Sequence, residues 1–308
     1  MLEIEFKSLQ LSNGETMAYR LRRGTGTANG RTLLLVHGNM TSSVHWDLFM
    51  ESFDPSHTLI AVDLRGFGAS TYHVPVRSIA DFSEDLRLFV DGLSLTSFTL
   101  MGWSMGGGVA MQFAASYPQY VEALILLASM STRGYPCYHA EEKDEQSGQV
   151  QARRLRTRAE IAEMDKTKLV QRAYDHRDKA FLRNLWNRQV YVIQEPDEVR
   201  YETYLNDMLT QKNLLDVYDA MNRFNMSAKD HEAGDGSSDA ARLSMPTLVL
   251  WGNQDKVVTR QMTEELVEDL GGHVVYRELD HTGHSPMVDN LALLCRVVAE
   301  FMERRRLA

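Results

Sequence analysis

Continuous apolar runs, separated by segments of helical periodicity, are the feature that most constrains the fold of this chain. The runs read RTLLLVHG (31–38), HTLIAVDL (57–64), SFTLMGW (97–103), VEALILLAS (121–129) and PTLVLWGNQD (246–255). A strand that is apolar along its length has both faces buried, as in a parallel sheet with helices on each side. The sequence therefore predicts an α/β fold built on a mostly parallel sheet.

Three further strands complete the predicted sheet. Residues 3–11 and 15–23 flank the dipeptide Asn13-Gly14, which is typical of a hairpin turn, and residues 273–279 follow the last apolar run. Between the strands, apolar residues recur with helical spacing, most clearly from Ser78 to Leu93. We therefore expect eight strands in one sheet, with helices covering both of its faces.

The alternation of strands and helices is interrupted once, at Met130. Residues 130–242 are charged and aromatic, and their apolar side chains recur with a helical period. Strands resume only after this stretch. We therefore expect an α/β core made of residues 1–129 and 243–308, with residues 130–242 forming a helical cap, or lid, inserted after the sixth strand.

Composition narrows the class of protein. The net charge of −9, without a basic stripe, argues against a nucleic-acid partner. The first residues, MLEIEFKSLQ, carry charges that a signal peptide would lack, and no apolar run is long enough to cross a membrane. Cys137 and Cys295 lie in different regions, and Cys295 falls on the apolar face of a predicted helix, as a buried thiol. We therefore expect a cytoplasmic protein without a transmembrane segment.

The glycine-rich stretch FTLMGWSMGGGVAMQF (98–113) places a serine between a strand and a helix. Its central residues, Gly102 to Gly106, match the pattern G-x-S-x-G, in which a sharp turn holds a nucleophilic serine in a strained conformation. The two glycines leave the room that such a turn needs. We therefore identify Ser104 as the candidate nucleophile.

A serine nucleophile of this kind needs a base and an acid, which in open α/β sheets come from loops at the carboxyl ends of strands. His284, in the loop LDHTGHSPMV before the last helix, is the expected base, and Asp255, at the end of PTLVLWGNQD, is the expected acid. His281 is expected to be a structural neighbour of the base. A metal site at Asp280, His281 and His284 is not expected, because no further ligand clusters with them.

The loop HGNMTSS (37–43) follows the third strand and is the expected oxyanion hole. The backbone N–H groups of Asn39 and Met105 can point at one oxygen, while His37 fixes the loop. The side chains expected around the pocket are apolar: Met40, Trp103, Met130 and Trp186. For Trp186, packing inside the cap is favoured over facing the substrate. No cofactor is expected, because these groups suffice for acyl transfer.

The motifs HGN, DLRGFGAS, GWSMGG, WGNQD and GHSP make the whole chain resemble the α/β-hydrolase superfamily. A closer resemblance lies in HGNMTSSVHWD, VDLRGFGAST, GWSMGGGVAMQF, TRGYP, YLNDMLTQKNLLDVY and GHSPMVDN, which are similar to the intracellular poly(3-hydroxybutyrate) depolymerases of the Bacillus type. Those are cytoplasmic serine hydrolases that degrade the amorphous storage polyester to 3-hydroxybutyrate units. The resemblance implies Ser104 as nucleophile, Asp255 as acid and His284 as base, with a polyester granule or short hydroxyalkanoate esters as partner and substrate.

Other functions share these residues. A lactonase or small-ester esterase would use the same constellation with a different pocket. A carbon–carbon bond hydrolase is less favoured, because nothing marks a site for a ring-fission diketone. A non-catalytic receptor or scaffold would not need Ser104, Asp255 and His284 together. The loop HGNMTSS also resembles that of haloalkane dehalogenases, but these enzymes use an aspartate nucleophile, so neither dehalogenation nor epoxide hydrolysis is expected.

Overall fold

The apolar runs of the sequence form the strands of one eight-stranded sheet. In this computed structural model, which describes all residues except 1, 27–29, 140–141, 144–149, 152 and 305–308, the strand order is β1-β2-β4-β3-β5-β6-β9-β10. The strands are β1 (Ile4–Gln10), β2 (Thr16–Arg22), β3 (Thr32–Val36), β4 (Thr58–Val62), β5 (Phe98–Trp103), β6 (Val121–Leu127), β9 (Thr247–Gly252) and β10 (Val274–Leu279). Only the pairs β1–β2 and β2–β4 are antiparallel, which confirms the predicted mostly parallel sheet.

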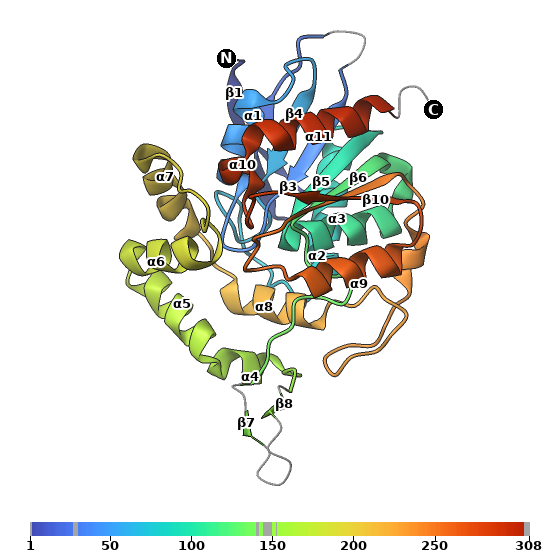
Figure 1. Cartoon of the computed structure of the whole chain (residues 1–308). Coiled ribbons are helices and arrows are strands. Elements are labelled where there is room, and N and C mark those ends of the chain that lie inside the picture. The colour runs from blue at the N-terminus through green and yellow to red at the C-terminus, as the bar shows by residue number, and fades with distance from the viewer. Residues whose placement is uncertain (1, 27–29, 140–141, 144–149, 152, 305–308) are drawn as a thin grey trace.

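Helices cover both faces of this sheet, as the sequence predicts. Figure 1 shows α1 (Asp47–Ser52) and α11 (Leu291–Arg304) on one face, and α2 (Ile79–Gly92), α3 (Met105–Ser116) and α9 (Arg260–Leu270) on the other. Helix α2 begins with a capping box, in which the side chains of Ser78 and Asp81 each bond the other's backbone N–H. The short elements are η1 (Ser43–Trp46), η2 (Pro118–Tyr120), β7 (Glu142–Lys143), β8 (Val150–Gln151), η3 (Asp239–Arg242) and α10 (Pro286–Asp289).

Further helices occupy the sequence between β6 and β9. They are α4 (Arg158–Glu163), α5 (Asp165–Asp175), α6 (Lys179–Gln189), α7 (Glu198–Met208) and α8 (Leu214–Arg223), and they lie together beside the α/β layers (Figure 1). Helix α7 is tied to the core, because Arg200 forms ion pairs with Asp47 and Glu51 of α1. Tyr204 of α7 also donates a hydrogen bond to Asp47. The division of the chain at residues 130 and 242 stays a prediction.

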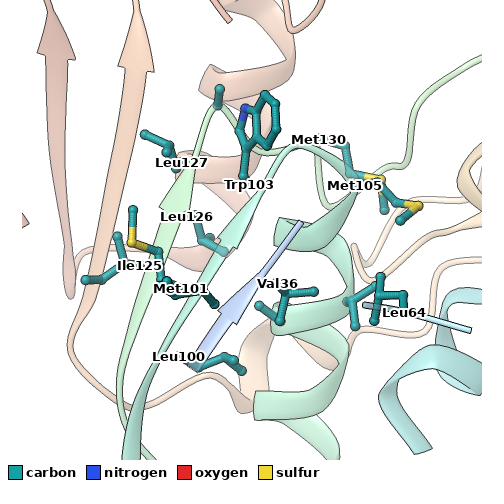
Figure 2. Close-up of a cluster of buried hydrophobic side chains, with 14 of the residues drawn as sticks. Val36, Leu64, Leu100, Met101, Trp103, Met105, Ile125, Leu126, Leu127 and Met130 are labelled. Atoms are coloured by element: carbon teal, nitrogen blue, oxygen red, sulfur yellow. The ribbon is translucent and has the colours of Figure 1, made fainter. Parts of the chain in front are cut away.

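The centre of the sheet is sealed from solvent. Figure 2 shows Val36, Met101 and Leu126, from the neighbouring strands β3, β5 and β6, in one cluster of side chains with no exposed surface. Each such side chain contributes about 1.5–3 kcal/mol through its burial. Because these three strands are parallel neighbours, the loops that follow them meet at one edge of the sheet.

Two smaller expectations can be compared with the structure. Cys137 is buried and Cys295, where the sequence predicted a buried thiol, is half-buried; both are free. Burial raises the pKa of each thiol to about 11, so both are protonated at neutral pH. Within the described ranges, no helix combines the length and the apolar character that crossing a membrane requires.

We expect Gly106→Ala to destabilise the protein, because an added Cβ would lie 2.5 Å from the His37 carbonyl oxygen and closer still to that of Val36. These backbone atoms cannot move aside without distorting the sheet, so the free energy of unfolding should fall by about 2 kcal/mol or more in chemical denaturation. Gly272→Ala is the control, since nothing lies within 4 Å of a Cβ at that position. A Gly106→Ala protein as stable as the wild type would contradict the close packing.

Candidate active site

Ser104 occupies a strained turn between β5 and α3. Its φ of 58° and ψ of −121° lie where a side chain is rarely accommodated, a strain of about 1–3 kcal/mol. The Ser104 N–H donates to the Leu127 carbonyl at 3.0 Å, and the Gly107 N–H donates to the Ser104 carbonyl at 3.0 Å. These bonds hold the turn, and the serine side chain remains half-buried at the edge of the sheet.

The structure brings the three residues expected for a catalytic triad into one hydrogen-bonded line. The Ser104 Oγ lies 3.0 Å from His284 Nε2, and His284 Nδ1 lies 2.8 Å from Asp255 Oδ2. The other oxygen of Asp255 accepts the N–H groups of Val257 and Val258 at 2.7 and 2.9 Å. Because the Asp255 carboxylate can only accept at neutral pH, Nδ1 of His284 carries a proton and Nε2 is free to accept the serine proton.

Two side chains that the sequence did not indicate as supports hold the loop of His284. The indole N–H of Trp103 donates to the His284 carbonyl at 2.8 Å, and the Gly283 N–H donates to Asp289 Oδ2 at 2.8 Å. Burial raises the pKa of Asp289 to about 6. His281 has an exposed side chain, and of the two histidines only His284 is bonded to Ser104. The role of His284 as the base stays a prediction.

His37 supports the loop that follows β3. Its Nε2 accepts the Leu64 N–H at 3.0 Å, so its Nδ1 carries the proton and donates to the Gly38 carbonyl at 2.7 Å. Burial lowers the pKa of His37 to about 4, which keeps the ring neutral at physiological pH. Gly38 lies directly against the nucleophile, because an added Cβ there would be 3.0 Å from Ser104 Cβ. The loop that His37 fixes is thus placed beside Ser104.

The two residues expected to form the oxyanion hole flank this position. Asn39 follows Gly38, and its side-chain oxygen accepts a hydrogen bond from Gln211 Nε2 at 2.9 Å. Met105 is the first residue of α3, so its N–H has no acceptor within the helix. Both residues line the same pocket as Ser104. Gln211 precedes α8, and its contact with Asn39 could not be read from the sequence.

The pocket above Ser104 has a volume of about 680 Å³, including its open mouth. All four side chains expected around it contribute to its lining: Met40, Trp103, Met130 and Trp186. Figure 2 shows Met130 near Met105 and Trp103 at the end of β5. For Trp186, the sequence favoured packing inside the cap over facing the substrate. In the structure its ring contacts Tyr191 and also lines the pocket.

Sequence analysis missed the rest of the lining. It consists of residues from the segment between β6 and β9, together with Val257: Tyr135, Lys166, Leu185, Gln189, Val190, Tyr218 and Met221. Five of them lie in helices and have the local pattern of ordinary helix residues, because their common position arises only when α5, α6 and α8 pack together. Tyr135, Val190 and Val257 lie outside these helices. Among the described residues, His, Cys, Asp and Glu side chains form no group of three or more that could hold a metal ion.

The chain is similar to known proteins in both sequence and fold. The family model described as alpha/beta hydrolase fold matches residues 31–291. An uncharacterized protein of Mycobacterium tuberculosis is 34% identical over 117 residues, which are 38% of this chain and 33% of that protein. The matched part of the chain thus spans about a third of the length of such mycobacterial relatives.

Other relatives match over most of their length. A 2-hydroxy-6-oxononadienedioate/2-hydroxy-6-oxononatrienedioate hydrolase of Burkholderia vietnamiensis is 26% identical over 288 residues, which are 91% of this chain and 89% of that protein. The structure of an esterase from Exiguobacterium antarcticum superposes with a TM-score of 0.72 at 16% identity, covering 97% of this chain and 100% of the esterase. At this identity the structural likeness concerns the fold alone.

The buried His37 predicts a pH dependence of stability. Its pKa is about 4 in the folded protein and about 6.5 in the unfolded chain, so unfolding takes up a proton between these values. The stabilisation is complete above pH 6.5 and is lost as the pH falls towards 4, by about 2 kcal/mol between pH 7 and 4.5. In the His37→Gln protein, the free energy of unfolding measured by chemical denaturation should fall less between pH 7 and 4.5, by this amount. An NMR titration in which the His37 ring protonates near pH 6.5 would contradict the prediction.

Proposed function

Because the chain belongs to the alpha/beta hydrolase fold family, we propose that it is a serine ester hydrolase that cleaves carboxylic esters through an acyl-enzyme intermediate. The observation that carries the proposal is the line of hydrogen bonds from Ser104 through His284 to Asp255. A nucleophile, a base and an orienting acid in this arrangement are what acyl transfer needs.

The proposed mechanism assigns one task to each residue. Ser104 Oγ attacks the ester carbonyl while His284 Nε2 takes its proton, and Asp255 stabilises the imidazolium that forms. The backbone N–H groups of Asn39 and Met105 stabilise the oxyanion, a contribution of about 10²–10³ in rate for each donor of this kind. His284 then donates its proton to the departing alcohol. A water molecule, activated by the same imidazole, finally releases the acid.

The proposed substrates are poly(3-hydroxybutyrate) or short hydroxyalkanoate esters. Two observations support them: the sequence resembles the Bacillus-type depolymerases within residues 130–242 as well as in the core, and the pocket wall is rich in methionine and aromatic side chains. Residues 130–242 would then act as a cap over Ser104, since most of the lining comes from them. The proposal includes a cytoplasmic location and action at the surface of polyester granules. A lactone or simple ester is the alternative substrate.

A carbon–carbon bond hydrolase is the second candidate. The relative from Burkholderia vietnamiensis favours it, because that protein is named as a hydrolase of an oxononadienedioate. The same serine, histidine and aspartate could serve that reaction, so the substrate must be tested directly. Product release should be measured from amorphous polyhydroxybutyrate granules, a panel of lactones, p-nitrophenyl butyrate and a ring-fission dienone. Turnover of the dienone alone would exclude the ester hydrolase.

We expect Ser104→Ala to lower kcat for p-nitrophenyl butyrate by about 10⁴-fold or more, because the variant has no nucleophile. The midpoint of unfolding serves as the control for the fold and should not fall, since removing one oxygen leaves the packing intact. A folded variant that keeps a tenth of the wild-type kcat would refute the assignment of Ser104.

Replacement of the two histidines should separate their roles. His284→Ala should be nearly as damaging as the loss of Ser104, whereas His281→Ala is the matched control with an exposed side chain and should keep substantial activity. If His281→Ala proves the more harmful change, the base has been misassigned.

Asp255→Asn should lower kcat by about 10³–10⁴-fold, because the imidazole loses its orientation.

A further inference from the structure

One cation faces the otherwise uncharged wall of the pocket. Among the residues that line it, Lys166 is the only lysine or arginine, and no aspartate or glutamate accompanies it. Lys166 lies in the first turn of α5, and its Nζ is 5.9 Å from the centre of the Tyr135 ring. Lys166 is exposed to solvent, and it also contributes to the pocket lining.

Within the described part of the chain, the Lys166 ammonium forms no ion pair with a carboxylate. The acidic neighbour Glu163 is paired with Lys168, whose Nζ lies 2.7 Å from it. Desolvation lowers the pKa of Lys166. An ammonium that is partly desolvated without a counter-ion is destabilised, and an anion brought by a ligand would remove that cost.

Two phenols line the pocket together with this lysine. Burial raises the pKa of Tyr135 to about 12 and also raises that of Tyr218, so both hydroxyl groups stay protonated and can donate hydrogen bonds. Their hydroxyl groups donate no hydrogen bond to any residue in the described ranges. The pocket lining therefore offers an ammonium and two phenols as hydrogen-bond donors to an anionic group.

We propose that Lys166 binds a free carboxylate of the substrate, so that the protein prefers esters of molecules that also carry a carboxylate. The inference rests on the proposed ester hydrolysis and specifies its substrate class: the carboxyl end of a short hydroxyacyl oligomer, where the terminal unit bears that group. A single ammonium beside apolar walls suits a monoanion. A phosphate dianion would call for an arginine fork or several cations, and the lining holds neither.

The test compares the linear dimer of 3-hydroxybutyrate with its terminal carboxamide, which is neutral and of nearly equal size. Release of the monomer is followed by chromatography. For the wild type, kcat/KM should be about 10-fold or more higher for the acid, mainly through KM, as expected for a hydrogen-bonded charge pair. Lys166→Met should abolish this preference. Lys168→Met, on the same helix but paired with Glu163, is the matched control and should keep it.

Equal kcat/KM for the acid and the carboxamide in the wild type, or an undiminished preference in Lys166→Met, would overturn the inference while leaving ester hydrolysis in place. If the wild type cleaves neither compound, the proposed function fails for these substrates, and calorimetry then decides the inference on its own. The dimer acid should bind to Ser104→Ala about 10-fold more tightly than the carboxamide, and the addition of Lys166→Met should remove the difference. Equal binding of the two compounds to Ser104→Ala would refute a carboxylate site.

Discussion

The close approach of helix α3 to strand β3 is the constraint on which the site depends. Gly106 allows it, because any side chain there would collide with the carbonyl groups of Val36 and His37. Since β3 and β5 are parallel neighbours, the same contact brings the loop at Gly38 against Ser104. The candidate nucleophile and the loop beside it are therefore positioned by backbone packing, which is more rigid than contacts between flexible side chains.

Buried polar contacts fix the helices between β6 and β9 on the core. His45 Nδ1 lies 3.2 Å from Asp207 Oδ2, the His45 ring stacks on Tyr204, and the Ser42 hydroxyl donates to the other oxygen of Asp207 at 2.6 Å. Loss of the Ser42 hydroxyl would leave one buried oxygen of Asp207 without its donor, which costs about 1–3 kcal/mol. Helix α7 is thereby restricted to one position relative to η1, although buried pairs of this kind add little to stability itself.

The sequence was informative where local pattern and chemistry coincide. Apolar runs predicted the eight-stranded sheet, glycine spacing predicted the turn at Ser104, and chain order selected Asp255 and His284, which the structure brings together. It was uninformative where a role arises from contact between distant segments. Trp103 was expected to line the pocket, but its bond to the His284 carbonyl spans 181 positions. Lys166 has the appearance of ordinary surface charge until α5 packs beside the pocket.

The hydrogen bond between Gln211 and Asn39 connects the segment between β6 and β9 to the loop beside Ser104. Gln211 also accepts the Tyr174 hydroxyl at 2.9 Å, and Tyr174 belongs to α5, so a chain of polar contacts joins that helix to the loop beside Ser104. A displacement of α5 must strain or break these bonds. By thermodynamic reciprocity, if a ligand bound at α5 tightens binding at the loop beside Ser104, a ligand bound at that loop tightens binding at α5 by the same factor.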